Sequence, residues 1–267
     1  GEAPQDGHDH DHEQETPDTA TTDVPDEPAT PVAYTAEATD ANGATLTVYE
    51  ANIAKEYPDA HLHMVSPQVG VPGMNQFEFE VSQYELAAQT EGVEDRNCAN
   101  SGKGQHIHFI LNNQPYKAKY EAVFEEELAE GENVLLAFLS RSYHESIKNG
   151  TAHVVTSLWA GEGGSSFDVN GEHLFYSRPK GTYKLAESNR FLLDFFLINV
   201  DLEEAGYKVR ATIYGAVFEL PTWKPYFIEG LQAGEHTCRI ELIDGAGNVV
   251  EGPYNDSGDR TFTVTEG

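Results

Sequence analysis

The sequence has few cysteines, few cations and no long apolar run. Only Cys98 and Cys238 occur in 267 residues, too few for a disulfide framework, and they form no CxxC pair for zinc or redox chemistry. The sequence allows one bridge between them, although two separate thiols are the simpler expectation. No segment approaches the roughly 18 consecutive apolar residues that a membrane-spanning helix needs.

The charge balance excludes two classes of partner. The chain has 16 Lys and Arg against 45 Asp and Glu, a formal net charge of -29. Such a field repels nucleic acid and anionic membrane surfaces, so neither is expected as a direct partner. It favours cations, basic protein surfaces or simple solubility.

Motifs of the common enzyme classes are missing as well. The sequence contains no GxSxG, no HExxH, no phosphate-cradling glycine loop and no Cys/His pair in a nucleophile context. We therefore expect a protein that is not an enzyme.

The N-terminal segment 1–33 differs in composition from the rest of the chain. Residues 1–32 hold no Phe, Trp or Tyr and no Lys or Arg, and are rich in Asp, Glu, Thr and Pro. Such a composition cannot bury enough apolar surface to offset the entropy of ordering, and it predicts a disordered acidic tether. His8, His10 and His12 alternate within it, and flexible HxHxH segments chelate zinc, copper or nickel without a folded geometry.

From Tyr34 onward the pattern is typical of an all-β protein. Short runs of alternating apolar residues, such as 45–49 and 77–81, are separated by Gly, Pro, Asn and Asp. Long helical periodicity is scarce. We assign residues 34–59 to an N-terminal strand and linker.

An internal repeat organises the remainder of the chain. Segments 60–67, 104–111 and 128–132 align in order with 172–179, 206–213 and 231–235. Each copy has about 100 residues and about seven short strands, as in an immunoglobulin-like or fibronectin-like β-sandwich. The sequence thus predicts two tandem sandwiches, at 60–160 and 172–267, joined by a linker at 161–171. The first has an insertion at 87–103.

Histidines in the first copy are candidate metal ligands. Ile107 and Phe109 must face the core, so His106 and His108 point outward, about 7 Å apart on one strand. Their repeat counterparts are Lys208 and Arg210, which predicts a solvent-facing pair. Imidazoles suit copper or zinc, and the further candidates are His61, His63 and His144. The alternative is that these histidines are neutral polar residues on a sheet face or domain interface.

Two further candidate binding sites do not involve histidine. The turn 244–248 is rich in Asp and Asn but lacks the spaced ligand set of a calcium loop. Trp159, Trp223 and Tyr226 are the aromatic residues best suited to contact a protein partner, although each also suits a core.

Two segments support a resemblance. Gly104–Leu111 reads GQHIHFIL and Ala137–Ser146 reads AFLSRSYHES. Over most of residues 50–267 the chain resembles uncharacterised bacterial cell-envelope lipoproteins that carry the automatic label "phosphopeptide-binding protein". Its first copy is similar to small domains with a Gly-His-His-His strand. The resemblance implies a secreted or envelope protein, lipid-anchored at the outer membrane or cell surface, and the start at Gly1-Glu2-Ala3-Pro4 suits a processed lipoprotein.

The label also implies a phosphate site. Forkhead-associated domains use a Ser-Arg-x-His stretch, whereas here one extra residue separates Ser140-Arg141 from His144. We therefore rank phospholigand binding below two other functions. The first is a non-enzymatic, surface-tethered binding or scaffolding protein with an envelope partner. The alternative is an envelope copper- or zinc-binding protein.

Overall fold

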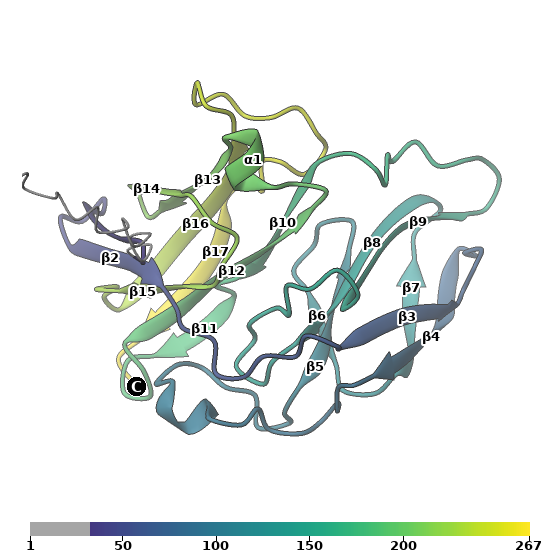
Figure 1. Cartoon of the computed structure of the whole chain (residues 1–267), viewed down its shortest axis with the longest axis horizontal. Helices are drawn as coiled ribbons and strands as arrows, with labels where there is room; N and C mark the ends of the chain where they lie inside the picture. Colours follow the sequence, from purple (N-terminus) through teal and green to yellow (C-terminus); the bar gives the residue numbers. More distant parts are fainter. Residues whose placement is uncertain (1–32) are drawn as a thin grey trace, which may run out of the picture. The chain divides into compact units, whose positions relative to one another are not determined.

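The computed structural model describes residues 33–267 and confirms an all-β chain built of sandwiches (Figure 1). The only helical elements in this range are a 3-10 turn, η1 (Val93–Asp95), and one short helix, α1 (Leu202–Ala205). No helix in this part of the chain has the length and apolar character needed to cross a membrane.

The first sandwich consists of two antiparallel sheets. Sheet 1 has the strand order β3 (His61–Ser66), β4 (Gly73–Ser82) and β7 (Val123–Leu128). Sheet 2 has the order β6 (Lys117–Lys119), β5 (His106–Leu111), β8 (Gly131–Ser140) and β9 (His153–Ala160). The core between them contains Phe77 and Phe109, whose rings meet edge to face with centroids 4.9 Å apart.

The second sandwich has two five-stranded sheets. Sheet 3 has the order β1 (Thr35–Thr39), β2 (Thr45–Glu50), β15 (Tyr226–Glu229), β12 (Arg190–Ile198) and β10 (His173–Arg178). Sheet 4 has the order β11 (Gly181–Lys184), β17 (Arg260–Thr265), β16 (Gly234–Ile243), β13 (Lys208–Ile213) and β14 (Ala216–Leu220).

The two copies share one topology. β3 pairs with β4 as β10 pairs with β12, and both pairs slip register near the same point, at Met64/Ser66 and at Tyr176/Arg178. Likewise β5 lies between β6 and β8 as β13 lies between β14 and β16. The internal repeat inferred from the sequence therefore corresponds to equivalent strands in the two sandwiches.

The N-terminal segment completes the second sandwich. Residues Tyr49 and Val48 of β2 lie opposite Phe227 and Ile228 of β15, and β1 pairs with β2 at the sheet edge. Leu46 and Val48 are fully buried in the core of this sandwich. The first sandwich is consequently inserted in the chain between the second strand and the remainder of the second sandwich.

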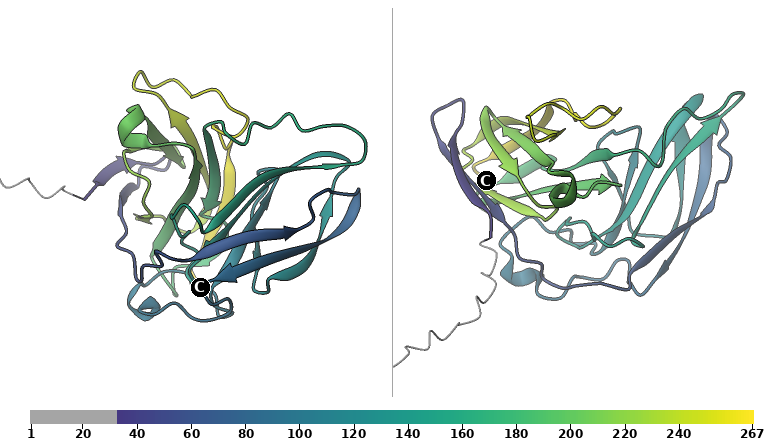
Figure 2. Two further views of the ribbon diagram at one scale, coloured as in Figure 1. Left: turned by 45° about the vertical axis from the view of Figure 1, so that its right-hand side comes forward. Right: turned by 45° about the horizontal axis from the view of Figure 1, so that its top comes forward.

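The two sandwiches bury a third apolar cluster between them. Phe138 of β8 stacks on Phe196 of β12, with ring centroids 4.7 Å apart. The other fully buried members of this cluster include Ile110, Leu136 and Phe175. Sheet 2 therefore has buried residues on both faces. Figure 2 shows the strands of the two sandwiches from two further sides. This arrangement determines the environment of the histidines on β5.

Candidate functional site

Three of the candidate histidines meet in one cluster. His106 and His108 lie on β5, and His144 lies in the turn that follows β8, the neighbour of β5 in sheet 2. One ring nitrogen of each lies within 4.8 Å of those of the other two, and no other group of three possible ligand residues is found in residues 33–267. We call these residues the histidine cluster.

The distances suit a metal ion. His106 Nε2 lies 3.0 Å from His108 Nε2 and 3.2 Å from His144 Nδ1. Two nitrogens bound at about 2.05 Å to one tetrahedral ion are about 3.3 Å apart. Two of the three nitrogen separations therefore match a tetrahedral ion, while the third, which lies within 4.8 Å, must shorten for all three rings to bind one copper or zinc ion.

Backbone geometry in the turn after β8 positions His144. This residue has a φ of 72°, in the left-handed region, and its N–H donates to the Arg141 carbonyl at 2.9 Å. Arg141 N–H in turn donates to the Glu145 carbonyl at 2.9 Å. The resulting tight turn directs the imidazole back toward β5. Non-glycine residues adopt this conformation in only a few per cent of cases, and histidine is among those that adopt it more often than most.

Hydrogen bonds orient the other two rings. His106 Nδ1 lies 2.8 Å from the Gly104 carbonyl, which only accepts, so Nδ1 carries the proton and Nε2 presents a lone pair. His108 Nδ1 lies 3.1 Å from the Ser177 hydroxyl of β10, which either donates or accepts. Metal-binding histidines commonly have such an oriented second nitrogen.

The prediction of a solvent-facing pair is wrong. His106 and His108 are both 0% exposed. In the second sandwich the equivalent Lys208 is exposed, because no part of the described chain packs over it on β13. In the first sandwich Ser177 and its neighbours on β10 cover the equivalent face. The alternation along β5 therefore predicts correctly which way the two histidine side chains point, but it does not predict that they are buried.

Aromatic side chains enclose the cluster. The Tyr116 ring stacks on His108 with centroids 3.5 Å apart and planes 7° apart, and its hydroxyl lies 3.2 Å from His144 Nδ1. The Tyr120 ring lies 5.1 Å from the His106 ring. Tyr120 also lines a surface hollow of about 480 Å³ together with Lys103 and Lys119. Tyr120 therefore contacts the His106 ring and also lines this hollow.

Burial keeps all three rings neutral. Desolvation lowers the pKa of His106 to about 4, and it lowers the pKa values of His108 and His144 well below the ordinary value of 6.5. Arg178 and Lys180 lower all three further, because both are positively charged. Protons therefore do not compete with a metal ion for these nitrogens near neutral pH.

The other candidate histidines lie elsewhere. His61 and His63 are exposed on β3 in sheet 1, and the cluster does not include them. His8, His10 and His12 lie outside the described residues. The cysteines are both free thiols, and Cys98 packs near Leu192 and Phe227.

The groups implied by the phosphopeptide label are engaged within the fold. Arg141 is 2% exposed, donates to the Lys55 carbonyl at 2.6 Å and 2.9 Å, and pairs with Glu145 at 3.1 Å. Ser140 and Ser142 are fully buried.

At the 244–248 turn, the Asp244 carboxylate accepts two backbone N–H bonds at 2.9 Å and so stabilises the turn itself.

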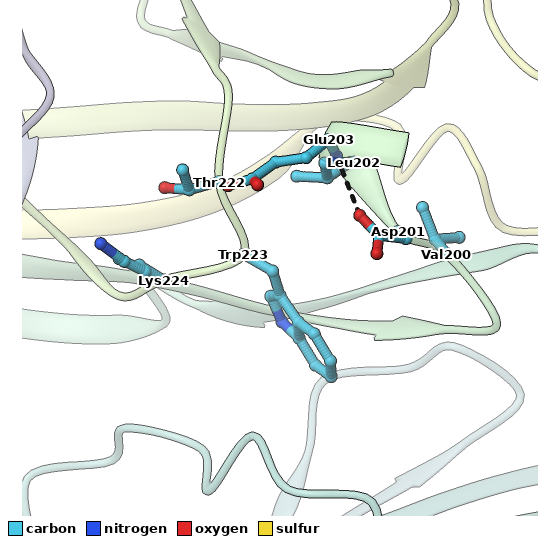
Figure 3. Close-up of a pocket in the computed structure, with 7 residues that line it drawn as sticks. All are labelled: Val200, Asp201, Leu202, Glu203, Thr222, Trp223 and Lys224. Atoms are coloured by element: carbon cyan, nitrogen blue, oxygen red, sulfur yellow. Dashed lines mark hydrogen bonds between the residues drawn. The ribbon is translucent and has the colours of Figure 1, made fainter. Parts of the chain in front are cut away.

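Of the three candidate contact aromatics, Tyr226 is excluded because it is fully buried. Trp223 is partly buried, donates from Nε1 to the Phe195 carbonyl at 3.1 Å, and lines a hollow of about 460 Å³ with Asp201, Thr222 and Lys224 (Figure 3). Asp201 caps α1 there by accepting from Glu203 N–H. This hollow does not include the histidine cluster.

The chain matches no family model and no curated protein. Among solved structures it is similar to the fibronectin(III)-like modules of CbhA from Clostridium thermocellum. That similarity has 11% identity and a TM-score of 0.26, over 76% of this chain and 94% of that chain. It is also similar to SGBP-B from the Bacteroides ovatus mixed-linkage glucan utilization locus, solved with a mixed-linkage heptasaccharide. Here the identity is 8% and the TM-score 0.23, over 76% of this chain and 70% of that chain. At these scores neither similarity bears on ligand or activity.

Proposed function

We propose that this protein is a non-enzymatic metal-binding protein of the bacterial cell envelope, in which the histidine cluster binds copper or zinc. One observation carries the proposal: three neutral imidazole nitrogens from two adjacent segments converge within 4.8 Å inside the folded chain. Imidazole is a preferred ligand of both metals, and three such ligands are the usual protein contribution to a site that keeps a further coordination position.

Electrostatics within the cluster supports the proposal. His106 Nε2 presents a lone pair to two other ring nitrogens, at 3.0 Å and 3.2 Å. Without an ion, a proton on His108 Nε2 can relieve one of these contacts. A metal ion relieves both, and the Ser177 hydroxyl then accepts from His108 Nδ1 instead of donating to it.

If the metal ion binds the native state and not the unfolded state, it raises the free energy of unfolding. The test uses the full chain with His8→Ala, His10→Ala and His12→Ala, which removes chelation by the N-terminal tether. A tenfold excess of free Zn(II) or Cu(II) over the dissociation constant stabilises the native state by about 1.4 kcal/mol, which raises the melting temperature.

The matched variants are His144→Asn and His61→Asn in the same background. Asn tolerates the left-handed backbone at residue 144, so the first variant removes a ligand without straining the turn. We expect His144→Asn to lose most of the melting shift and His61→Asn to keep it. An equal shift in both variants would contradict the proposal.

The cellular location belongs to the proposal as well. It is supported by the resemblance of the two histidine-containing motifs to envelope lipoproteins and by the acidic N-terminal composition. A protein partner in that setting is part of the same proposal, since Trp159 and Trp223 are only partly buried. Fractionation of the source cells, with labelled fatty acid as a probe for lipidation, tests this part independently of metal binding.

A further inference from the structure

Uncompensated positive charge surrounds the histidine cluster. Of the 16 Lys and Arg side chains, twelve form ion pairs within residues 33–267, and the four that do not are Lys103, Arg178, Lys180 and Arg260. Arg178 and Lys180 are the charged residues that lower the pKa values of the three rings. In a chain with 45 Asp and Glu, this is an unusual place for cations without anionic partners.

Arg178 is the most unusual of the four. It is 8% exposed, and its guanidinium donates to the Tyr183 hydroxyl at 2.9 Å and to the Tyr116 hydroxyl, both uncharged groups. Its Nε is buried without a hydrogen-bond partner among the described residues. Because a buried charge without a counter-charge is costly, an anion bound nearby would stabilise this arrangement.

Tyr116 connects this cation to the cluster. Its hydroxyl contacts both the Arg178 guanidinium and His144 Nδ1. Its ring lies parallel to His108 at 3.5 Å, whereas a metal bound to His108 Nε2 lies in the plane of the His108 ring. The phenol oxygen is therefore displaced from the metal by more than a bond length of about 2 Å. Tyr116 suits a hydrogen bond to a ligand of the metal and not direct coordination.

The sum of charges at the metal-loaded cluster also favours a bound anion. Three neutral imidazoles, a divalent ion, Arg178 and Lys180 together carry four positive charges with no carboxylate among them. We propose that the metal in the histidine cluster binds a small exogenous anion, of the carboxylate or halide type, as its fourth ligand, and that Arg178 and Lys180 bind this anion. This inference rests on the proposed function.

Access for such an anion is consistent with the surface beside the cluster. The hollow at Tyr120 is lined by Lys103 and Lys119, and Lys103 Nζ lies 5.5 Å from the centroid of the Tyr120 ring. The Tyr120 ring also contacts the His106 ring. Glu121 also lines this hollow and Lys119 pairs with Glu126, so Lys103 is the lining cation without a carboxylate partner in residues 33–267 and the one that an entering anion meets.

The test is an azide titration of the copper-loaded protein. The full chain with His8→Ala, His10→Ala and His12→Ala receives one equivalent of Cu(II), and azide is added at constant ionic strength in a buffer without chloride. Azide bound to Cu(II) gives a charge-transfer absorption band. We expect a saturable band, with affinity roughly tenfold lower in Lys180→Met because one nearby charge is lost.

Controls separate the different reasons for a negative result. Lys184→Met removes an exposed charge from the neighbouring strand and is expected to leave azide affinity unchanged. Arg178→Lys keeps one positive charge and is expected to retain copper while binding azide more weakly. If copper binds and azide does not, or if Lys180→Met binds azide as tightly as the parent, the inference is overturned and the proposed function stands. If copper does not bind, the proposed function itself fails.

A titration of the metal-free protein tests whether the anion binds to the metal or to the cations alone. The metal-free protein in chelator is expected to show no change in melting temperature over the same azide range. Equal stabilisation with and without copper would mean that the cations alone bind the anion, and it would overturn a metal-bound fourth ligand.

Discussion

The neutral state of the buried histidines makes the stability of the metal-free protein depend on acid in a defined way. Desolvation lowers the pKa of His106 from 6.5 to about 4. Below pH 6.5 the unfolded chain binds a proton here that the folded chain does not, so folding loses free energy as the pH falls from about 6.5 to about 4. At about 1.4 kcal/mol per pKa unit, the loss due to His106 is about 3 kcal/mol, and it is absent above pH 7.

The assay is urea unfolding in chelator, followed by tryptophan fluorescence, at pH 7.5 and at pH 4. Carboxylate protonation affects the stability of an acidic chain over the same range, so the comparison is with His106→Asn. This variant keeps a donor near the Gly104 carbonyl but does not titrate. We expect the parent to lose about 3 kcal/mol more than the variant between the two pH values. Parallel losses in the two proteins would refute the reasoning.

Further predictions concern the contact between the sandwiches and the thiols. Asp194 is fully buried and accepts from Lys148 Nζ at 2.6 Å, so Asp194→Asn should lower the free energy of unfolding by about 3 kcal/mol, measured in urea. Lys184→Met, which breaks an exposed pair, should cost under about 0.5 kcal/mol in the same assay. Phe138→Ala, in the cluster between the sandwiches, should cost about 3–5 kcal/mol, and a smaller loss would indicate a loosely packed contact. Burial raises the pKa of the Cys98 thiol to about 11, so the folded protein at pH 8 should react with iodoacetamide about a hundredfold more slowly than the unfolded chain, as mass spectrometry can follow.

The architecture of each sandwich could be predicted because local pattern and repeat agree. On β5 the alternation of Ile107 and Phe109 correctly identified the core face, and the alignment with residues 206–213 correctly paired β5 with β13. Period-two alternation follows from strand geometry alone, so it does not depend on distant parts of the chain. Turn residues such as Asn112 and Asn113, with φ of 53° and 54°, are likewise local signals for the end of β5.

The surroundings of the cluster could not be predicted, because they depend on contacts between the two sandwiches. Alternation gives the direction in which His106 and His108 point but not what covers them. Their repeat counterparts, Lys208 and Arg210, are charged residues, and this suggested that the two histidines are exposed to solvent. In the described chain, however, the covering layer is present only over β5 and not over β13. The two copies differ because Ser177 and Arg178 of the second sandwich cover β5 of the first. No local sequence pattern links these two residues to β5.

The insertion at 87–103 illustrates the same limit. Its position could be predicted from the repeat, but its contacts could not, because it bridges the sandwiches. Arg96 contacts Asn52 and Tyr143, while its own carbonyl accepts from Arg190 Nη1 at 3.1 Å. Such bonds tie this loop, whose one regular element is η1, to both sandwiches. Sequence alone distinguishes poorly between a free loop and a bridging one, because both are polar and irregular.

The insertion of the first sandwich into the second has a consequence for synthesis on the ribosome. Strand β2 leaves the ribosome early, but its partner β15 begins only at Tyr226, after the whole first sandwich and much of the second have been made. During that interval Leu46 and Val48 have no core to enter, although the first sandwich already has all of its strands. Domains generally fold as units in order of their synthesis. The histidine cluster needs Ser177 of β10, a strand of the second sandwich, for its cover, so it is completed only after the first sandwich has formed.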